Sequence, residues 1–290
     1  MNTINEMHGQ MNYPDRLRAQ IQQDGIVPLI GVYDVFSASI AARHFNGLFL
    51  SGFSFAASFY GLPDVGFISW SDIVSLAQRI RVLLPHQHIV VDIDDGYCDA
   101  DVACHVVGLL EQMGISGVVL EDQKRPRRCG HFGGKQILEL EVFMEKLERV
   151  LSQRKDLFIV ARTDAVAPDE VMRRVAAFSA TAADAILVDG ISDISIIKEI
   201  AALSTKPLVF NQLYGGKSPP MSLTQLREMG ISLVNYSTPC ITAAQSAMLG
   251  VMQKLKQQDG LLTEDLAPGV ALAECNALLN ENLRRDLHLK

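Results

Sequence analysis

Eight short runs of mostly apolar residues recur along the chain, separated by longer stretches with an apolar residue every three or four positions. The runs occupy residues 26–34, 47–52, 88–94, 117–122, 157–164, 185–190, 207–212 and 232–238. Nearly continuous apolar strands are typical of a parallel sheet that helices cover. Eight consecutive strand–helix units therefore predict an α/β fold, a closed (β/α)₈ barrel of the TIM type, with a doubly wound open sheet as the alternative.

The chain continues well beyond the eighth apolar run. Residues 243–260 form one long helical pattern, and residues 262–290 add a helical tail with several leucines. We therefore expect a single barrel domain over residues 1–290, with its core at about 26–258 and a C-terminal helical extension at about 262–290. An amphipathic surplus of this kind packs on a neighbouring subunit or covers its own barrel, and we favour exchange within a homo-oligomer, a dimer or a tetramer.

The composition excludes several classes of protein. The 290 residues are 48% hydrophobic, and they contain no apolar run of the roughly 18 residues that a bilayer requires. A net charge of −7 disfavours nucleic acid as a partner. The N-terminal residues lack the pattern of a secretory signal, and five scattered cysteines without CxxC spacing predict free thiols. We expect a cytoplasmic protein that binds neither nucleic acid nor membranes.

Acidic side chains gather where the third and fourth predicted strands end. Asp92 and Asp94 are two positions apart, which puts both side chains on one face of a strand, and Glu121 ends the next strand. In a βα barrel these strand ends form the active site. Converging carboxylates repel each other unless a cation or proton lies between them, and oxygen ligands without a histidine pair favour Mg²⁺ or Mn²⁺. The acids that we expect to cap helices or form ion pairs instead are Asp95, Asp99 and Asp122.

The loop after the fourth strand, residues 123–137, has an unusual composition. It contains five lysines and arginines, three glycines, one cysteine and one histidine. Glycines allow a loop to move and cations attract an anionic substrate, so the loop is predicted to be a lid over the site. Neighbouring cations also lower the pKa of a thiol, which singles out Cys129 among the five cysteines. A solvated basic loop is the alternative.

Eight segments carry a resemblance to a known family. They are IVVDIDDGY, VVLEDQ, RRCGH followed by GK, IVARTDA, YDVFSA, LSG, GLPD and FNQLYGGKSP. In order and spacing they resemble the signature segments of the phosphoenolpyruvate mutase/isocitrate lyase superfamily, from about residue 26 to residue 245. The resemblance implies a Mg²⁺-dependent barrel that acts on a small 2-oxo or 2-hydroxy carboxylate through an enolate.

The resemblance also implies roles for individual residues. Asp92 is similar to the direct metal ligand, and Asp94 and Glu121 support it, partly through metal-bound waters. Arg162 resembles the arginine that grips the substrate oxygens and stabilises the enolate. The other residues placed at the substrate are Tyr33, Asp64, Asn211 and the carboxylate cradle of Ser51, Gly52 and Phe53.

The lid segment bears on the reaction. Carbon–carbon lyases of the superfamily carry a Cys-Gly-His loop whose cysteine protonates the departing enolate, so Cys129 and His131 are expected to be catalytic. This lid and the GGKSP segment also resemble those of carboxyphosphonoenolpyruvate mutase, which leaves P–C bond formation open.

Departures from the family pattern bear on the substrate. Isocitrate and methylisocitrate lyases have glutamate at the positions that Asp189 and Tyr214 occupy in this chain. Methylisocitrate lyase has arginine at the position of Thr242. A third carboxylate would lack a partner here, so these two substrates are disfavoured. The leading hypothesis is a carbon–carbon lyase for a small 2-hydroxy dicarboxylate of the alkylmalate type. The alternatives are a phosphonomutase or a C–C hydrolase or decarboxylase acting on an oxaloacetate-like 2-oxo acid, and a member that has lost catalysis and only binds.

Overall fold

Eight parallel strands close into a barrel in the order in which they occur along the chain. The computed structural model describes residues 11–262 and 270–284. The strands are β1 (Val27–Val32), β2 (Gly47–Leu50), β3 (His88–Asp92), β4 (Gly117–Glu121), β5 (Phe158–Thr163), β6 (Ala185–Val188), β7 (Leu208–Asn211) and β8 (Ile231–Tyr236). Because β1 pairs with both β2 and β8, the sheet has no free edge. The predicted barrel is confirmed and the open sheet is excluded.

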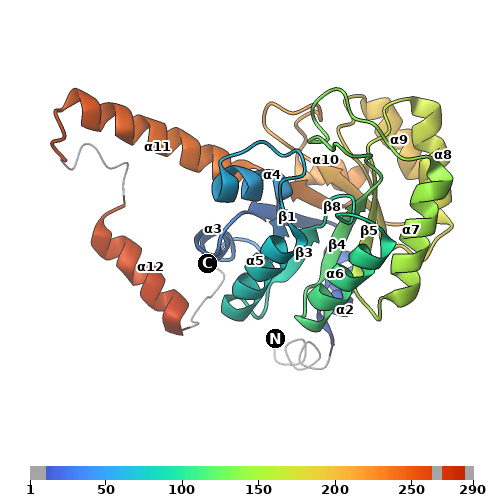
Figure 1. Cartoon of the computed structure of the whole chain (residues 1–290), viewed down its shortest axis with the longest axis horizontal. Helices are drawn as coiled ribbons and strands as arrows, with labels where there is room; N and C mark the ends of the chain where they lie inside the picture. Colours follow the sequence, from blue (N-terminus) through green and yellow to red (C-terminus); the bar gives the residue numbers. More distant parts are fainter. Residues whose placement is uncertain (1–10, 263–269, 285–290) are drawn as a thin grey trace.

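Helices surround the barrel (Figure 1). They are α2 (Tyr13–Asp24), α3 (Val35–Ala41), α4 (Gly52–Phe55), the π-helical turn η1 (Ala56–Tyr60), α5 (Trp70–Leu83), α6 (Ala100–Gln112), α7 (Leu140–Gln153), α8 (Pro168–Ser179), α9 (Ile194–Leu203), α10 (Leu223–Glu228), α11 (Pro239–Gln257) and α12 (Leu272–Arg284). Within the described ranges, no helix is long and apolar enough to cross a membrane.

Two apolar clusters hold the barrel together. The larger one lies between the strands and the helices around them, and the smaller one fills the barrel interior. Leu17 and Ile21 of α2 belong to the interior cluster together with inward-facing residues such as Val27 and Val90. Helix α2 therefore plugs the mouth where the strands begin, and the opposite mouth remains for the site.

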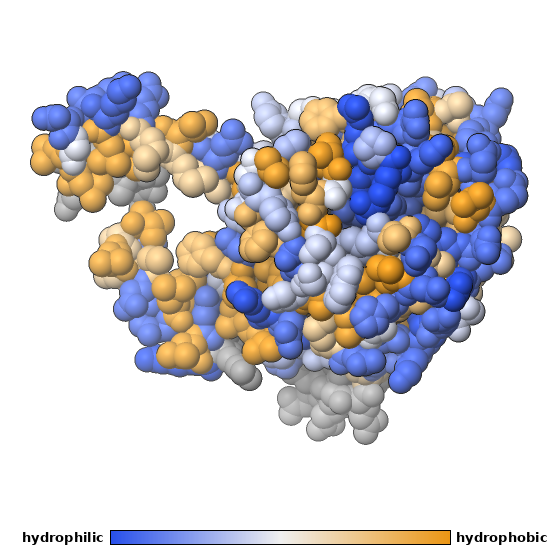
Figure 2. Space-filling view, viewed as in Figure 1, coloured by the Kyte–Doolittle hydropathy of each residue, from blue (hydrophilic) through white to orange (hydrophobic). Residues whose placement is uncertain are grey.

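The C-terminal helices extend beyond the barrel. Helix α11 runs away from it in Figure 1, and none of its 19 residues is buried within the described structure. Helix α12 contacts the turn after α3 of the same chain, where Arg43 forms an ion pair with Glu281 at 2.8 Å. Figure 2 shows apolar side chains along both helices. Met248, Leu249 and Leu283 are among the exposed apolar residues of these helices. The predicted exchange with a neighbouring subunit stays a prediction, and residues 263–269 and 285–290 of the predicted extension lie outside the described residues.

Candidate active site

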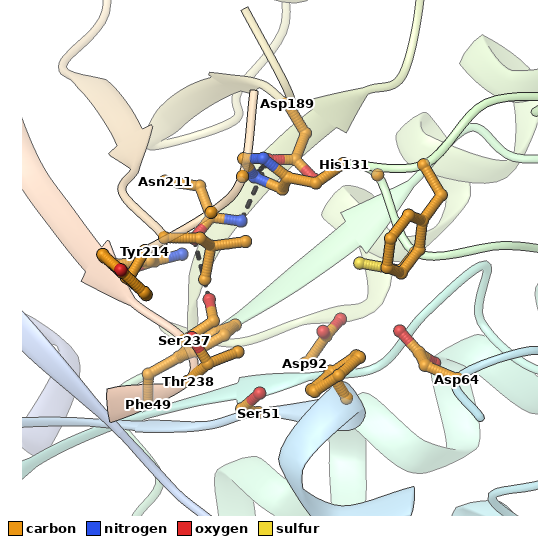
Figure 3. A pocket seen from close by; sticks show the side chains of 18 of the residues that line it. Phe49, Ser51, Asp64, Asp92, His131, Asp189, Asn211, Tyr214, Ser237 and Thr238 are labelled. Atoms are coloured by element: carbon orange, nitrogen blue, oxygen red, sulfur yellow. Dashed lines mark hydrogen bonds and ion pairs between the residues drawn. The ribbon is translucent and has the colours of Figure 1, made fainter. Parts of the chain in front are cut away.

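A cavity of about 150 Å³ opens at the carboxyl ends of the strands (Figure 3). The predicted site residues that line it are Ser51, Phe53, Asp64, Asp92, Cys129, His131, Arg162 and Asn211. Asp94 and Glu121 are buried directly behind it, linked to its lining by ion pairs through Arg127 and Arg162. The barrel thus brings together side chains from six different strands and loops.

Tyr33 lies elsewhere. Strand β1 ends at Val32, and the chain then turns into α3 through its N-cap Asp34. Tyr33 consequently lines a separate apolar groove together with Phe36 and Tyr236. The substrate-binding role implied for Tyr33 does not fit this placement.

Three buried acids form ion pairs with one buried guanidinium on the β3–β4 side. Arg127 reaches inward from the loop after β4 and forms ion pairs with Asp64, with Asp94 at 3.0 Å and with Glu121 at 2.9 Å. Its side chain is about 1% exposed. A cation placed this deep among carboxylates offsets much of their mutual repulsion.

Burial nevertheless disfavours the charged form of these acids. Burial, which outweighs the opposing arginines, raises the pKa of Asp92 and Asp94 above their usual range and the pKa of Glu121 to about 7. Within the described structure, Asp94 Oδ1 and Glu121 Oε2 accept no well-directed hydrogen bond, and the nearest cations are the guanidinium groups of Arg127 at 3.0 Å and Arg162 at 3.1 Å. The group as a whole would gain stability from another cation.

The residues present fit a magnesium ion of the water-rich kind. In the described ranges, no three acidic, histidine or cysteine side chains converge closely enough to form a complete set of direct ligands. Mg²⁺ usually keeps several waters and needs only one or two carboxylates. Gly52 leaves space beside Asp92 and Asp94, because a Cβ there would lie 3.2 Å and 3.3 Å from their oxygens. Asp92 lines the cavity and has the position of a direct ligand, which stays a prediction.

Arg162 stands at the centre of the site. It projects from β5, where its Nη2 lies 3.1 Å from Glu121 and 2.7 Å from Asp189, and its Nε lies 2.9 Å from Asp164. These three carboxylates fix the guanidinium plane from the protein side. Burial opposes the low pKa of Asp189, but Arg162 and His131 lower it below its usual range, so this carboxylate stays charged. Arg162 is thereby oriented to bind an anion in the cavity.

The glycine-rich loop covers the cavity from above. Gly130 packs so closely on Asp189 that a Cβ would lie 1.8 Å from its oxygen. His131 Nδ1 accepts a hydrogen bond from the Lys217 amide at 3.0 Å, so the ring proton is on Nε2, which lies 3.3 Å from Asp189. Lys135 binds Asp164 at 2.8 Å. The loop therefore occupies the closed position that a lid requires.

Cys129 lies in this lid, but its electrostatics differ from the prediction. Burial raises the pKa of its thiol to about 12. The expected lowering is wrong, because the guanidinium of Arg127 turns toward the acids and Arg128 is exposed. At neutral pH the group holds its proton, which disfavours a nucleophile, and burial makes it a weaker acid than an exposed thiol.

Neutral polar groups line the β7–β8 side. Asn211 donates a hydrogen bond to Asp189 at 2.9 Å and accepts one from Ser237 at 2.8 Å, so both ends of its amide are occupied. Asn235 is fully buried on β8, and neither Nδ2 nor Oδ1 has a partner within the described structure. An unpaired buried amide costs roughly 1–3 kcal/mol.

The lining residues that the sequence analysis did not single out include Phe49, Asn235 and Ser237. The alternation of side chains along a strand could have identified them. Phe49 of β2 lies two positions before Ser51, and Asn235 of β8 lies two positions before Ser237, so each pair faces the inside of the barrel.

Comparisons with known proteins agree with this geometry. The family model for phosphoenolpyruvate phosphomutase matches residues 17–256. The petal death protein of Dianthus caryophyllus is 32% identical over 90% of this chain and 83% of its own length. The 2,3-dimethylmalate lyase of Eubacterium barkeri is 28% identical over 86% of this chain and 88% of its own.

A solved structure of similar shape is oxaloacetate acetylhydrolase in complex with the inhibitor 3,3-difluorooxalacetate. It superposes with a TM-score of 0.87 at 25% identity, covering 95% of this chain and 96% of that one. The family match over most of the barrel, together with the relatives and the shared fold, shows that the chain is an enzyme of the phosphoenolpyruvate mutase/isocitrate lyase superfamily.

Proposed function

We propose that the protein is a Mg²⁺-dependent carbon–carbon lyase for a small 2-hydroxy dicarboxylate of the alkylmalate type. The observation that carries the proposal is the position of the lid thiol: Cys129 lines the cavity together with Ser51, Asp92 and Arg162, where it can donate a proton to a substrate fragment. A carbanion-like fragment that leaves by retro-aldol cleavage requires a proton donor of this kind.

The pyruvate-like part of the substrate binds on the β2–β5 side. The hydroxyl of Ser51, the amides of Gly52 and Phe53 and the guanidinium of Arg162 hold its oxygens. A bound Mg²⁺ supplies Lewis-acid stabilisation of negative charge next to Asp92. Arg162 adds electrostatic stabilisation without reorganisation, because three carboxylates already fix its orientation.

Cleavage then follows from the positions of these groups. A basic group of the site takes the proton of the substrate hydroxyl, the carbon–carbon bond breaks, and the electron pair of that bond passes to the departing fragment as an enolate. Cys129 transfers its thiol proton to the carbon of that fragment, and the closed lid keeps bulk water away meanwhile. The products are a 2-oxo acid and a carboxylic acid.

The cavity favours a small substrate. Its volume of about 150 Å³ is well below the roughly 300–1,000 Å³ of drug-sized sites. Arg162 and His131 are the basic side chains among the described lining residues, and the position at Thr242 carries no charge. A third carboxylate would be desolvated without a partner, which supports excluding isocitrate and methylisocitrate.

Product analysis tests the proposal. The purified protein is incubated with a panel of 2-hydroxy and 2-oxo dicarboxylates in Mg²⁺, in Mn²⁺ or in a chelator, and products are identified by mass spectrometry. The proposal predicts paired 2-oxo acid and carboxylic acid products from an alkylmalate, and no turnover in the chelator. Turnover that survives the chelator would contradict the metal assignment.

The small cavity also favours a second candidate, a C–C hydrolase or decarboxylase for an oxaloacetate-like acid. The same panel separates the reactions, because hydrolysis adds the mass of water, decarboxylation loses carbon dioxide, and a phosphonomutase produces a phosphonate. A chain that only binds would show ligand stabilisation without any product.

The C-terminal helices support an oligomer, which we propose to be a dimer or a tetramer. An apolar groove of about 650 Å³ lies between α3, β8 and the start of α11, lined by residues such as Phe36, Ile40 and Ala243. Helix α11 presents Met248, Leu249 and Met252 with no covering residue within the described structure. Packing these surfaces against a second copy would remove both from water.

Truncation tests the oligomer directly. Deleting the chain from Leu262 onward should reduce the mass measured by light scattering and lower the thermal midpoint. An unchanged mass would refute the exchange of this segment.

A further inference from the structure

Arg162 faces more negative charge than one guanidinium can offset. It contacts the carboxyl groups of Glu121 at 3.1 Å, Asp164 at 2.9 Å and Asp189 at 2.7 Å. The three acidic side chains are at most 1% exposed, so water screens their charge poorly. A substrate anion that approaches Arg162 would be repelled by these acids unless other groups compensate them.

Each of the three acids has a second partner, and all three partners come from the lid, residues 123–137. The pairs are Arg127 with Glu121 at 2.9 Å, His131 with Asp189 at 3.3 Å, and Lys135 with Asp164 at 2.8 Å. The three lid residues follow one another at intervals of four positions. Figure 3 shows one of these pairs, with His131 beside Asp189. The lid therefore offsets acidic charge around Arg162 in addition to covering the cavity.

Lys135 is the member of this set that acts at a distance from the substrate. Its side chain is 3% exposed, and it is not among the described residues that line the cavity. Asp164 Oδ1 accepts hydrogen bonds from Lys135 Nζ at 2.8 Å and from Arg162 Nη2 at 3.2 Å. Because the two cations share one carboxylate oxygen, Lys135 offsets part of the charge that Arg162 would otherwise neutralise.

We infer that Lys135 is a positioning residue whose charge offsets that of Asp164 and so leaves the positive charge of Arg162 for a substrate anion. The inference rests on the proposed function, which places the pyruvate-like unit at Arg162. Coulomb energy is proportional to the charge of the ligand, so losing Lys135 should weaken a dianion more than a monoanion of the same shape. A lysine that only held the lid in place would affect both ligands equally.

Two probes of matched shape test the inference, each with Mg²⁺. Oxalate is a dianion, and oxamate has an amide in place of one carboxylate and therefore one charge less. The proteins are the wild type, Lys135→Met, Lys135→Gln, Lys135→Arg and Lys217→Met. Lys217 is a matched control, because its Nζ also binds the lid, at the carbonyl oxygen of Phe132, but it is exposed and forms no ion pair with the described residues. Calorimetry gives the affinities, and thermal midpoints without ligand show which variants are folded.

Both uncharged variants, Lys135→Met and Lys135→Gln, should bind oxalate about 10-fold more weakly than the wild type and oxamate only about threefold more weakly. Lys135→Arg keeps the charge and should stay within about threefold of the wild type for both probes. Lys217→Met should change the two affinities by the same factor.

Equal losses for oxalate and oxamate in the uncharged variants would overturn the inference, as would oxalate binding by Lys135→Gln at the wild-type affinity. Uncharged variants that do not fold would show a structural role, which also overturns it. The proposed function is judged on the wild type alone. If the wild type binds oxalate no more tightly in Mg²⁺ than in a chelator, the proposed metal site fails, and the inference that rests on it fails too.

Discussion

The β3–β5 side and the β7–β8 side of the cavity differ in the charge of the side chains that line them. On the first side, buried acids and two arginines form a dense set of ion pairs, including Arg127 with Glu121 at 2.9 Å and Arg162 with Asp189 at 2.7 Å. On the second side, Asn211 and Ser237 are neutral and hydrogen-bond to each other at 2.8 Å, and Asn211 also donates to Asp189. In the proposed function, the charged side carries the chemistry and the neutral side contacts the rest of the substrate.

The two sides also differ in what a mutation can change. A charged network loses function as a unit, because each buried charge depends on its partners. A neutral contact can be altered singly and changes which ligand fits. The following predictions use that difference, beginning with the change of largest effect.

Removing a carboxylate from the charged side should abolish turnover. Asp92→Ala removes the proposed direct ligand, and it also relieves repulsion among the buried acids, so the fold should survive. We expect no Mg²⁺-dependent activity above background and an unchanged or higher thermal midpoint without metal. Activity is measured on the substrate identified by mass spectrometry, and full activity in this variant would sink the metal assignment.

Replacing the lid thiol should cause a large but incomplete loss of turnover. Cys129→Ser keeps the size of the side chain and substitutes a hydroxyl that is a weaker acid than the thiol, so kcat should fall by roughly 10²–10⁴-fold. Unfolding should be little affected. Near-normal turnover in this variant would favour the mutase reading, which needs no acid at this position.

A charge added to the neutral side should widen the choice of substrate. Thr242 lines the cavity from the first turn of α11, so Thr242→Arg offers a cation where none is present among the described residues of that side. We expect tricarboxylates to bind roughly 10-fold more tightly, the worth of a good charged contact. Calorimetry with citrate as a probe measures this, and an equal gain for oxalate would show a nonspecific effect of charge.

The smallest effect concerns thiol labelling. Cys98 is exposed, whereas Cys129 is partly covered and the pKa of its thiol is raised to about 12 by burial. Only the thiolate reacts, so iodoacetamide should modify Cys98 before Cys129 near neutral pH. Peptide mapping after brief exposure gives the order, and faster labelling of Cys129 would mean that the lid opens and its thiol ionises in solution.

Local sequence patterns predicted the site residues that lie on the strands or at their ends. The spacing of Asp92 and Asp94, and the place of Glu121 and Arg162 at strand ends, follow from alternation and from the mouth of a barrel. The direction of a loop side chain does not follow from such patterns. The sequence places Arg127 two positions before Cys129, but its guanidinium turns inward to the acids, and burial raises the pKa of the thiol.

Long-range packing decided the remaining differences. Tyr33 has the right place in the sequence, yet β1 ends one residue earlier and the chain turns away. Asn235 reads as one polar residue in an apolar strand, and only the closed barrel shows that its amide has no protein partner. Such facts depend on the neighbours that folding supplies from distant parts of the chain.

Helix α2 closes one end of the barrel, so the site opens at the other end only. Leu17 and Ile21 seal one end, so every molecule enters and leaves beneath the lid. Two products of the proposed cleavage would leave such a site one after the other. In the proposed lyase reaction, we expect the fragment that receives its proton from Cys129 to leave first and the fragment bound by Arg162 to leave last. Inhibition by the two products should therefore follow an ordered kinetic pattern, with the late product competing directly with the substrate.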